Sequence, residues 1–538
     1  MVRPFMRDFH KQDIMIASGL FLLGLLTRIP FAGDMIYHSD SVRFALAMKQ
    51  YDVGQMRPHA PGYIIYVALA KFIDFFTDDA RTSLIGISVF ASAATLSVLY
   101  LLAKKMYGKT NGIICCLILL TSPLFWFNGE MPFTYALEGL LCTIFGLTCY
   151  GMLVGEKKWL FFAAISMGLA TGVRQHIIIM FLPMWLYALK NCSIKQIVIS
   201  FLIFGVVCLA WFIPMIMFSG GLTAYLTALE AQYMTWVVHP APILFKLKLR
   251  GAIFLKFIIY SFGLGLFPMI YYFGYFFKPS AIVNDTRLKF ICLWIFPLTL
   301  FYIGFNLYNP GHIVVLLPPV FIYLADSIRG LSIDFEDAFK NIFSGNLYKR
   351  IKFLKMVFSF KSIAYLTTVI LIVINIWIFL FKDTPVSYAA IQKGDLQLAE
   401  LVRLTEKNFD NKQTAILACR FSTQAGFYLP DYRIYCPFPL IFSESELPID
   451  AQNLYISFHY QTTPKTFWIP TNFEIEPIAL PAGIDTLVLW EKELSEYYQV
   501  TNRPLKEIDS TITDDRIYYL SIEPGERIYY DYHYLTVK

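Results

Sequence analysis

Long apolar runs alternate with short polar segments over the first 380 or so residues of the chain. The runs are apolar on all sides rather than on one face, which is typical of helices that are buried or cross a membrane. A helix needs about 20 mostly apolar residues to span the bilayer. The pattern therefore predicts about eleven spans, at 14–33, 83–103, 111–127, 133–154, 159–173, 176–190, 194–218, 252–277, 290–308, 311–328 and 362–382.

Basic residues in the connecting segments indicate the orientation, because Lys and Arg concentrate in cytoplasmic loops. With a cytoplasmic N-terminus, the basic segments that fall inside are 104–109, 156–158, 190–195, 278–289 and 329–361. This holds only if the short apolar stretch 61–76, which contains Lys71 and Asp74, does not cross. We expect that stretch to be a juxtamembrane or re-entrant helix, and the C-terminus to lie outside. A bacterial inner membrane is favoured, with the endoplasmic reticulum as the alternative.

The segment after residue 383 has a different composition from the rest. Residues 384–538 contain 13 Lys and Arg against 21 Asp and Glu, whereas the remainder of the chain is basic. Alternating patterns and turn residues predict a short helix at 422–429 and strands at 414–421, 433–437, 453–460 and 486–490, with a hairpin of 516–522 and 527–535 around Pro524 and Gly525. We expect a transmembrane domain at 1–382 and a small extracytoplasmic α/β domain at 383–538.

Composition agrees with this division. The chain is 57% hydrophobic and 16% charged, whereas soluble domains have about 25% charged residues. The fold class expected is an all-α polytopic membrane bundle with the α/β domain at its C-terminus. The basic residues lie in short loops, so nucleic acid is not an expected partner. Of the nine cysteines, Cys419 and Cys436 alone lie in the tail, where they could pair in an oxidising compartment.

The predicted topology places most of the ionisable residues that interrupt apolar sequence at the outer face. A charge near the bilayer centre costs roughly 2.5 kcal/mol or more, so a cavity or partner is expected to solvate it. Asp40 lies in SDSVRFALAMKQYD, whose pattern predicts a helix at the membrane interface. Ser39 or Asp40 could cap that helix, and Asp40 could act as a general base. The two interpretations are compatible.

Two further outer segments contain charged residues. In RPHAPGY, Arg57 and His59 are predicted at a helix N-terminus, where an anion such as a phosphodiester is favoured. The alternative is a plain loop in which Arg57 touches lipid phosphates. Glu130, in FWFNGEMPFTY, could share a proton or cation with Asp40, or be a solvated loop residue. If a divalent cation is bound, Asp40 and Glu130 are its expected ligands.

Arg174 and His176 interrupt an otherwise apolar run, and His312 follows a Pro-Gly pair. Arg174 could face a polar cavity or snorkel to the interface. His312 could begin a helix that faces a cavity, or be a satisfied helix-end histidine. The substrate-binding residues predicted from these segments are Arg57, His59, Tyr63, Tyr135, Arg174, His176, Asn309 and His312.

Taken in order, these motifs resemble the GT-C superfamily of membrane glycosyltransferases, and most closely its branch with protein O-mannosyltransferases and lipid-A aminoarabinose transferases. The matching segments, within about 14–330, are HSDSVRFALAMKQYD, HAPGY, LLTSPLFWFNGEMPFTYALE, GLATGVRQ and PGHIVVLLPP. The first motif has one acidic residue, Asp40, where the family has two, and Glu130 stands where relatives often have Asp. Metal dependence is therefore left open.

The resemblance implies inverting transfer of a hexose or pentose from a polyprenyl-phosphate carrier to a protein or glycolipid at the outer face. Asp40 would take the acceptor proton, and Arg57 or Arg174 would neutralise the phosphate. Membrane lipids are further expected partners. The alternative is a multi-pass lipid or solute transporter. Transporters, however, place charges near the midplane and often contain internal repeats, and we find no repeat. A non-catalytic scaffold is a third possibility.

Overall fold

The computed structural model describes residues 10–236, 243–272, 284–305, 307, 309–342, 359–418, 421–435, 478–492, 494, 504–523, 526–531 and 534–537. The chain divides into two compact units, which we describe separately. The helical unit comprises Met1–Ala32, Pro61–Met217 and Ala241–Ala390. The sheet unit comprises Gly33–Ala60, Phe218–Pro240 and Ile391–Lys538.

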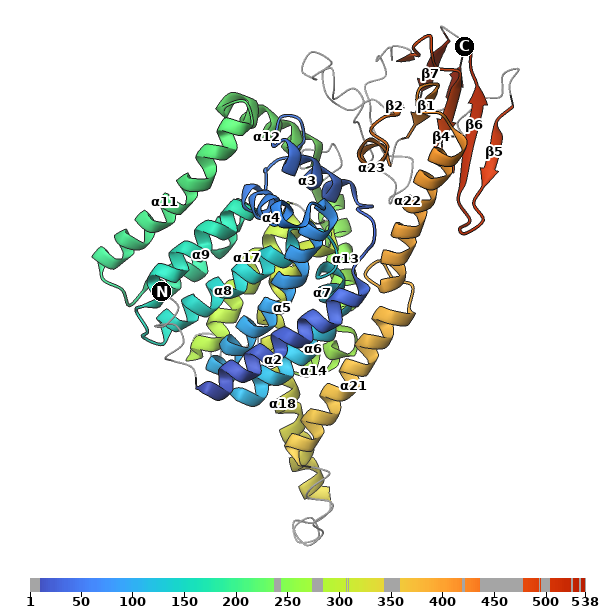
Figure 1. The fold of residues 1–538 in the computed structure, drawn as a ribbon. Helices are drawn as coiled ribbons and strands as arrows, with labels where there is room; N and C mark the ends of the chain where they lie inside the picture. The colour runs from blue at the N-terminus through green and yellow to red at the C-terminus, as the bar shows by residue number, and fades with distance from the viewer. Residues whose placement is uncertain are drawn as a thin grey trace. The chain divides into compact units, whose positions relative to one another are not determined.

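Helices make up the described part of the helical unit (Figure 1). They are α2 (Lys11–Arg28), η1 (Ile29–Phe31), α4 (Ile64–Thr77), α5 (Ala80–Tyr107), α6 (Lys109–Thr121), α7 (Pro123–Asn128), α8 (Tyr135–Leu153), α9 (Trp159–Val173), α10 (Ile177–Leu189), α11 (Ile194–Phe218), α13 (Ile243–Phe262), η2 (Gly263–Gly265), α14 (Leu266–Tyr271), α17 (Thr286–Gly304), η3 (Pro310–Leu316), α18 (Leu317–Ile342) and α21 (Phe360–Phe381).

Eight helical segments of the described chain are long and apolar enough to cross a membrane. They are Lys11–Phe31, Ala80–Tyr107, Tyr135–Leu153, Ile194–Phe218, Leu247–Tyr271, Thr286–Gly304, Pro310–Ile342 and Phe360–Phe381. The shorter apolar helices α6, α9 and α10 account for the other expected ranges. The prediction of a polytopic helical bundle is confirmed. Helix α4 has 14 residues and, like α6, α9 and α10, is shorter than the roughly 20 residues that a span requires.

Helix α5 lies at the centre of the bundle and packs against α2, α4, α6 and α8. Asp79 caps its start by accepting a hydrogen bond from the Thr82 N–H at 3.0 Å, and Gly108, with a φ of 91°, follows its end. Helix α2 approaches it closely, because a Cβ on Gly24 would lie 2.7 Å from the Ala93 Cα. Small residues allow such close approach between membrane helices.

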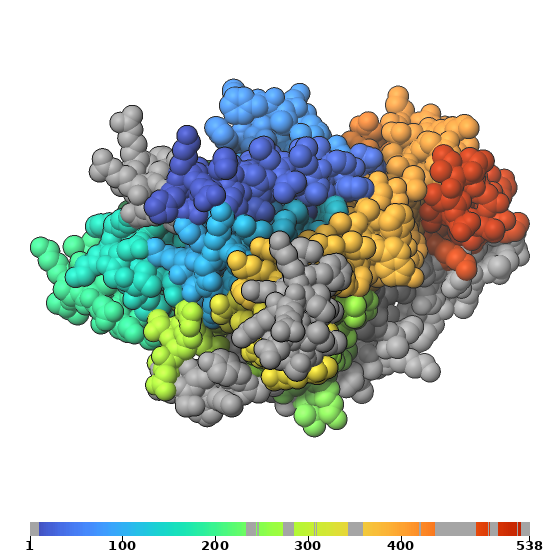
Figure 2. Space-filling view, turned by 90° about the horizontal axis from the view of Figure 1, so that it is seen from below, coloured from blue at the N-terminus to red at the C-terminus, as the bar shows by residue number. Residues whose placement is uncertain are grey.

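The opposite face of α2 is apolar and exposed, with Met15 67%, Leu22 56% and Leu26 68% accessible. This helix lies on the surface of its unit (Figure 2, dark blue). Exposed apolar side chains along a helix of this length are typical of a face that contacts lipid.

The sheet unit contains four described helices and two sheets. The helices are α3 (Ser39–Lys49), α12 (Leu222–Trp236), α22 (Tyr388–Asn408) and α23 (Ser422–Tyr428). The first sheet has the order β2-β1-β4-β6-β5, and the second has the order β3-β7-β8. The strands are β1 (Thr414–Leu417), β2 (Arg433–Tyr435), β3 (Ile478–Ala479), β4 (Thr486–Leu489), β5 (Lys506–Asp509), β6 (Arg516–Ser521), β7 (Arg527–Asp531) and β8 (Tyr534–Val537).

Strand β1 is parallel to both β2 and β4, and α23 connects β1 to β2. Successive side chains of a strand point to opposite faces. Ala415 and Leu417 accordingly enter one apolar core, whereas Ile416 enters a second core on the other face. Leu398 and Leu401 of α22 cover this second face, which explains why β1 is apolar without alternation.

The predicted hairpin of 516–522 and 527–535 is wrong. Strand β6 pairs with β4 on one edge and with β5 on the other, so neither edge is left for β7. Strand β7 pairs with β3 and β8 in the second sheet. The expected strand at 453–460, the turn at Pro524 and Gly525, and both Cys419 and Cys436 lie outside the described residues.

Candidate functional site

Arg174 follows the last residue of α9 and lies buried inside the helical unit. Its backbone is extended, with φ −153° and ψ 108°, so α9 ends here. The guanidinium Nε lies 3.3 Å from the Glu138 Oε2, and Nη2 donates to the Thr134 Oγ1 at 3.2 Å. Only 5% of the Arg174 side chain and 1% of the Glu138 side chain are exposed. The interpretation of Arg174 as a snorkelling residue is therefore wrong.

Two tyrosine rings flank the Arg174 guanidinium. Its carbon lies 5.5 Å from the ring centre of Tyr63 and 4.8 Å from that of Tyr135, distances at which cation–π attraction is appreciable in a dry site. Gly311 allows Tyr135 this position, because a Cβ there would lie 2.0 Å from the ring Cδ2. Asn309 caps η3 by accepting the Gly311 N–H at 2.9 Å. Four predicted residues thus contribute to one region.

Two buried histidines lie beside these rings. The His312 ring stacks on Tyr302 with centroids 5.4 Å apart, and meets the Tyr135 ring edge-on at 5.5 Å. The His176 ring stacks on Phe301 at 4.8 Å and approaches Tyr302 at 6.3 Å. His312 lies in the first turn of η3, as expected. Both predicted histidines therefore lie beside Tyr302.

We call this group of side chains the Arg174 cluster. Its members are Tyr63, Thr134, Tyr135, Glu138, Arg174, His176, Tyr302 and His312. Within the described part of the chain, Glu138 Oε1, His176 Nε2, Tyr302 Oη and His312 Nδ1 are buried without a hydrogen-bond partner. Buried polar atoms are normally paired, so the cluster has unused capacity to bind a polar ligand.

Glu130 is fully buried and has different contacts. Its Oε1 accepts a hydrogen bond from the Trp126 indole. Arg28, also fully buried, lies 5.1 Å from the centre of the Trp126 ring and donates to the Leu120 carbonyl at 2.7 Å. The interpretation of Glu130 as a solvated loop residue is therefore wrong. Among the described residues, its contacts go to this group rather than to Arg174.

Asp40 lies in the first turn of α3, in the sheet unit. The residue that caps α3 is His38, whose Nδ1 accepts the Asp40 N–H at 3.3 Å, so the expectation of Ser39 or Asp40 as the cap is wrong. The Asp40 Oδ1 lies 3.7 Å from the His59 Nδ1 and 3.9 Å from the Arg43 Nη1. The side chain of Asp40 is 22% exposed, although its Oδ1 is buried.

Arg57 and His59 also belong to the sheet unit. Arg57 is bridged to Asp52 through the backbone, and its Nη1 donates to the Gln50 Oε1 at 3.0 Å. The expectation that Arg57 and His59 begin a helix is wrong, because α4 begins only at Ile64. The structure brings His59 to Asp40 but holds Arg57 by an exposed, neutral partner.

The two carboxylates expected to hold a divalent cation have contacts within the protein. Asp40 already faces Arg43 and His59, and Glu130 accepts a hydrogen bond from Trp126. Calcium and magnesium sites instead gather several oxygen ligands around the ion. The described residues contain no group of three or more His, Cys, Asp or Glu placed to bind a metal.

Comparison with known proteins identifies the fold. A family model described as dolichyl-phosphate-mannose-protein mannosyltransferase matches residues 59–218. Crystal structures of ArnT from Cupriavidus metallidurans, bound to undecaprenyl phosphate and in the apo state, cover 95% of this chain and 97% of their own. Their TM-scores are 0.56 and 0.54, and their sequence identities are 10% and 11%. The chain has the GT-C fold. The expected resemblance is confirmed.

The chain also has a weaker structural match. The archaeal oligosaccharyltransferase AglB from Archaeoglobus fulgidus, in complex with an inhibitory peptide and a dolichol-phosphate, covers 78% of this chain and 63% of its own. Its TM-score is 0.45 at 11% identity. No curated protein sequence matches the chain.

Three residues of this GT-C chain were missed in the sequence. Glu138 stands in the apolar run after FWFNGEMPFTY, Arg28 lies inside the first apolar run, and Tyr302 lies inside a later one. The two charges could have been found, because an ionisable residue inside an apolar run is expected to have a partner. Tyr302 gives no such signal, since tyrosine is frequent in membrane helices near the interface.

Proposed function

We propose that the protein transfers a hexose or pentose, with inversion, from a polyprenyl-phosphate carrier to a protein or glycolipid acceptor at the outer face of a membrane. Two comparisons support this. The matching family is described as using dolichyl-phosphate mannose, and its match includes Glu138 and Arg174. The ArnT structure of the same fold contains undecaprenyl phosphate.

The observation on which the proposal depends is the Arg174 cluster. It is a group of polar side chains enclosed in an apolar bundle, with several donors and acceptors unused. The negative charge of Glu138 already balances the positive charge of Arg174. A neutral ligand with several hydroxyl groups, such as a sugar, therefore suits the cluster better than a second anion does. We assign sugar recognition to it, with Glu138, Tyr302 and His312 as hydroxyl partners.

The phosphate is assigned to Arg57. This guanidinium has the amide oxygen of Gln50 as its side-chain partner, so its charge is not neutralised by a carboxylate there. Arg–phosphate contacts are charge-assisted and often bidentate. Such a contact stabilises the phosphate most when it leaves with additional negative charge.

Asp40 is the proposed general base. It would take the proton of the acceptor hydroxyl while that oxygen forms a bond to the anomeric carbon. The bond from the anomeric carbon to the phosphate oxygen breaks on the opposite side, and its electron pair leaves with polyprenyl phosphate. Arg43 and His59, which flank the Asp40 carboxylate, would orient it. Glu130 is the second catalytic residue that we propose. Its Oε1 is held by the Trp126 indole, and its Oε2 is the oxygen that would contact the substrate.

A transfer assay tests the proposal. Purified protein in lipid nanodiscs is incubated with radiolabelled polyprenyl-phosphate mannose or aminoarabinose and with lipid or peptide acceptors. Release of polyprenyl phosphate that depends on the acceptor is expected. Arg57→Ala should lower this release, whereas Lys412→Ala, a change of an exposed basic residue in the same unit, should change it little. Movement of intact donor between leaflets without cleavage would instead support the transporter alternative.

The orientation is also proposed rather than observed. We place the N-terminus in the cytoplasm and the sheet unit outside, in a bacterial inner membrane, because the basic loops then face inward. Single cysteines introduced at Lys157 and at Asp514, in a background that lacks reactive native cysteines, should differ in labelling. An impermeant maleimide added to intact cells should label position 514 alone.

A further inference from the structure

The first outer segment of the chain is held by residues that follow it by more than 350 positions. The Asp395 carboxylate on α22 accepts two backbone hydrogen bonds, from the Asp34 N–H at 2.6 Å and from the Met35 N–H at 2.9 Å. The Tyr428 hydroxyl accepts the Ile36 N–H at 2.7 Å. Hydrogen bonds that a backbone N–H donates to a charged acceptor are stronger than those it donates to a neutral one.

The next residue is held through its carbonyl. The Gln424 Nε2 donates to the Tyr37 oxygen at 2.7 Å. Each of residues 34–37 therefore has a backbone hydrogen bond to a side chain of α22 or α23. Contacts of this kind fix the path of the backbone whatever its side chains are. We call residues 34–37 the docked segment.

Packing reinforces the hydrogen bonds. Ile36 is fully buried, and the side chains of Met35 and Tyr37 pack against the core that α22 and α23 share with the sheet. Tyr37 lies against Gly394, where a Cβ would be 2.7 Å from three atoms of its ring. Burial, and then the nearby Asp395 charge, raise the pKa of the Tyr37 hydroxyl above its ordinary value.

The docked segment leads directly into α3. Asp40 is three residues beyond Tyr37, and His38, the residue next to Tyr37, caps the helix. Helix α3 itself packs against α23, and the Lys49 Nζ lies 5.7 Å from the centre of the Phe427 ring. Both ends of α3 are therefore tied to the same part of the sheet unit.

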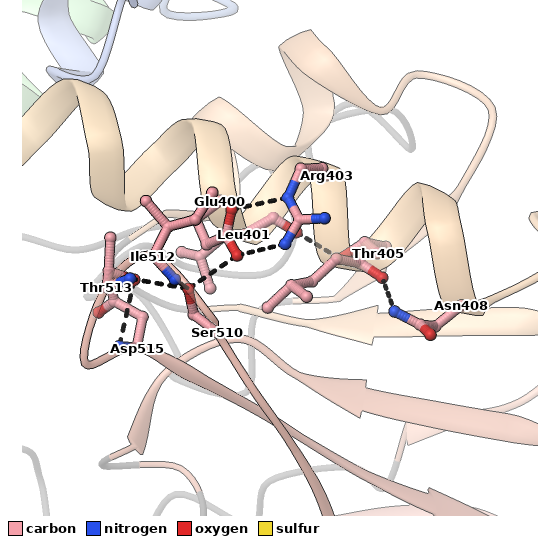
Figure 3. A network of polar contacts seen from close by, with 10 residues as sticks. Glu400, Leu401, Arg403, Thr405, Asn408, Ser510, Ile512, Thr513 and Asp515 are labelled. Atoms are coloured by element: carbon pink, nitrogen blue, oxygen red, sulfur yellow. Dashed lines mark hydrogen bonds and ion pairs between the residues drawn. The ribbon is translucent and has the colours of Figure 1, made fainter.

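Helix α22 is in turn fixed to the sheet. The Ser510 hydroxyl, just after β5, donates to the Glu400 Oε1 at 2.7 Å, and the Arg403 guanidinium holds both oxygens of Glu400 (Figure 3). The Trp490 indole, just after β4, donates to the Thr405 Oγ1 at 2.9 Å. Asp395 thus projects from a helix that cannot shift without breaking these contacts.

We propose that Asp395, Gln424 and Tyr428 are positioning residues for Asp40: the C-terminal sheet unit docks residues 34–37 and so sets the place and orientation of the carboxylate that starts α3. The proposal rests on the proposed function, in which Asp40 is the base. It gives the C-terminal part of the chain a role in the transfer step itself. A displacement of about 1 Å at a catalytic group can lower the rate by about 100-fold.

Three variants test the positioning role. Asp395→Ala removes both acceptors from the docked segment, and Asp395→Asn keeps one acceptor oxygen. Gly394→Ala leaves every hydrogen-bonding group in place but pushes Tyr37 away. The control is Glu406→Ala, which changes an exposed acid further along the same helix. Steady-state transfer, with donor and acceptor varied separately, is measured for each.

We expect kcat to fall about 10- to 100-fold in Asp395→Ala and Gly394→Ala, less in Asp395→Asn, and to change little in Glu406→Ala. The KM for the donor should stay within about twofold. Hydrogen exchange of the amides of residues 34–36 should accelerate in the same order, while the amides of β1 and β4 stay protected.

The two readouts separate the possible failures. Accelerated exchange at residues 34–36 with an unchanged kcat would overturn the positioning role although the docking is real. Unchanged exchange in Asp395→Ala would overturn the docking. If the wild-type protein transfers no sugar from any polyprenyl-phosphate donor, the proposed function fails, and the positioning role fails with it. Loss of protection in β1 and β4 of Asp395→Ala would identify a folding defect. The positioning role is then tested by comparing the milder variant Asp395→Asn with the wild type.

Discussion

Arg174 in the helical unit and Asp40 in the sheet unit are held by contacts of different kinds. Arg174 is enclosed by side chains, with Glu138 on one side and the rings of Tyr63 and Tyr135 on others. Asp40 is partly exposed, and the segment before it is held through the backbone. A substitution next to Arg174 removes one of its side-chain partners, whereas a substitution among the residues that hold the segment before Asp40 changes the backbone conformation of that segment.

The difference has a physical basis. Inside an apolar bundle a charge needs a partner of opposite charge, because leaving it unpaired is costly. Around Asp40, which is partly exposed and flanked by Arg43 and His59, what has to be supplied is conformational order, which costs about 1–2 kcal/mol per residue. We therefore expect stability and activity to respond together in the helical unit, and separately around Asp40.

The largest effect is expected at Asp40. Asp40→Asn preserves the size of the side chain and removes the base, so kcat should fall by about 10²–10⁴-fold with little change in melting temperature. Asp34→Asn is the matched control, because Asp34 is exposed and contributes its backbone N–H to the docked segment. Normal sugar transfer by Asp40→Asn would rule out the base role.

The second effect is on stability in the Arg174 cluster. Arg174→Ala leaves the Glu138 carboxylate buried without its ion-pair partner, and removing one member of a buried pair costs about 3–5 kcal/mol. The double variant Arg174→Ala with Glu138→Ala should recover part of this loss but none of the activity. Thermal unfolding in nanodiscs measures the first quantity, and the transfer assay measures the second. If the loss of stability in the double variant equals the sum of the losses in Arg174→Ala and Glu138→Ala, the two side chains are not coupled.

The contrast also explains what the sequence could predict. Spans were predictable, because an apolar run of sufficient length has few other stable structures, and Arg174 stood out because it interrupts such a run. The first outer loop was not predictable as part of the C-terminal unit. Its contacts with Asp395 and Tyr428 join residues more than 350 positions apart and use backbone groups, which leave no pattern in the side chains. Partners of β6 and β7 were misassigned because a strand pattern does not specify its neighbours.

A smaller effect should follow from repacking Tyr135. Gly311→Ala places a methyl group 2.0 Å from the ring Cδ2, so the ring must move away from Arg174. Overpacking of this kind costs about 1–3 kcal/mol, and it should raise the KM for the donor more than it lowers kcat if the cluster binds the sugar. Gly304→Ala is the control, since no atom lies within 4 Å of a Cβ at that position. Equal effects of the two substitutions would contradict the assignment of sugar binding to the Arg174 cluster.

The smallest effect concerns the support of the docked segment. Hydrogen bonds from Arg403 lower the pKa of Glu400 most, burial raises it, and the hydrogen bond from Ser510 lowers it again. The pKa therefore lies below its ordinary value. Because this pKa is lower in the folded protein, the stabilisation is present above the unfolded value near 4.5 and is lost as the pH falls through the folded value. The Arg403 side chain is 41% exposed, so solvent screening keeps the contribution small. Melting temperatures between pH 6 and pH 3 should therefore fall slightly less in Glu400→Gln than in the wild type. An equal fall in Glu400→Gln and in the wild type would show that Glu400 is not the group responsible.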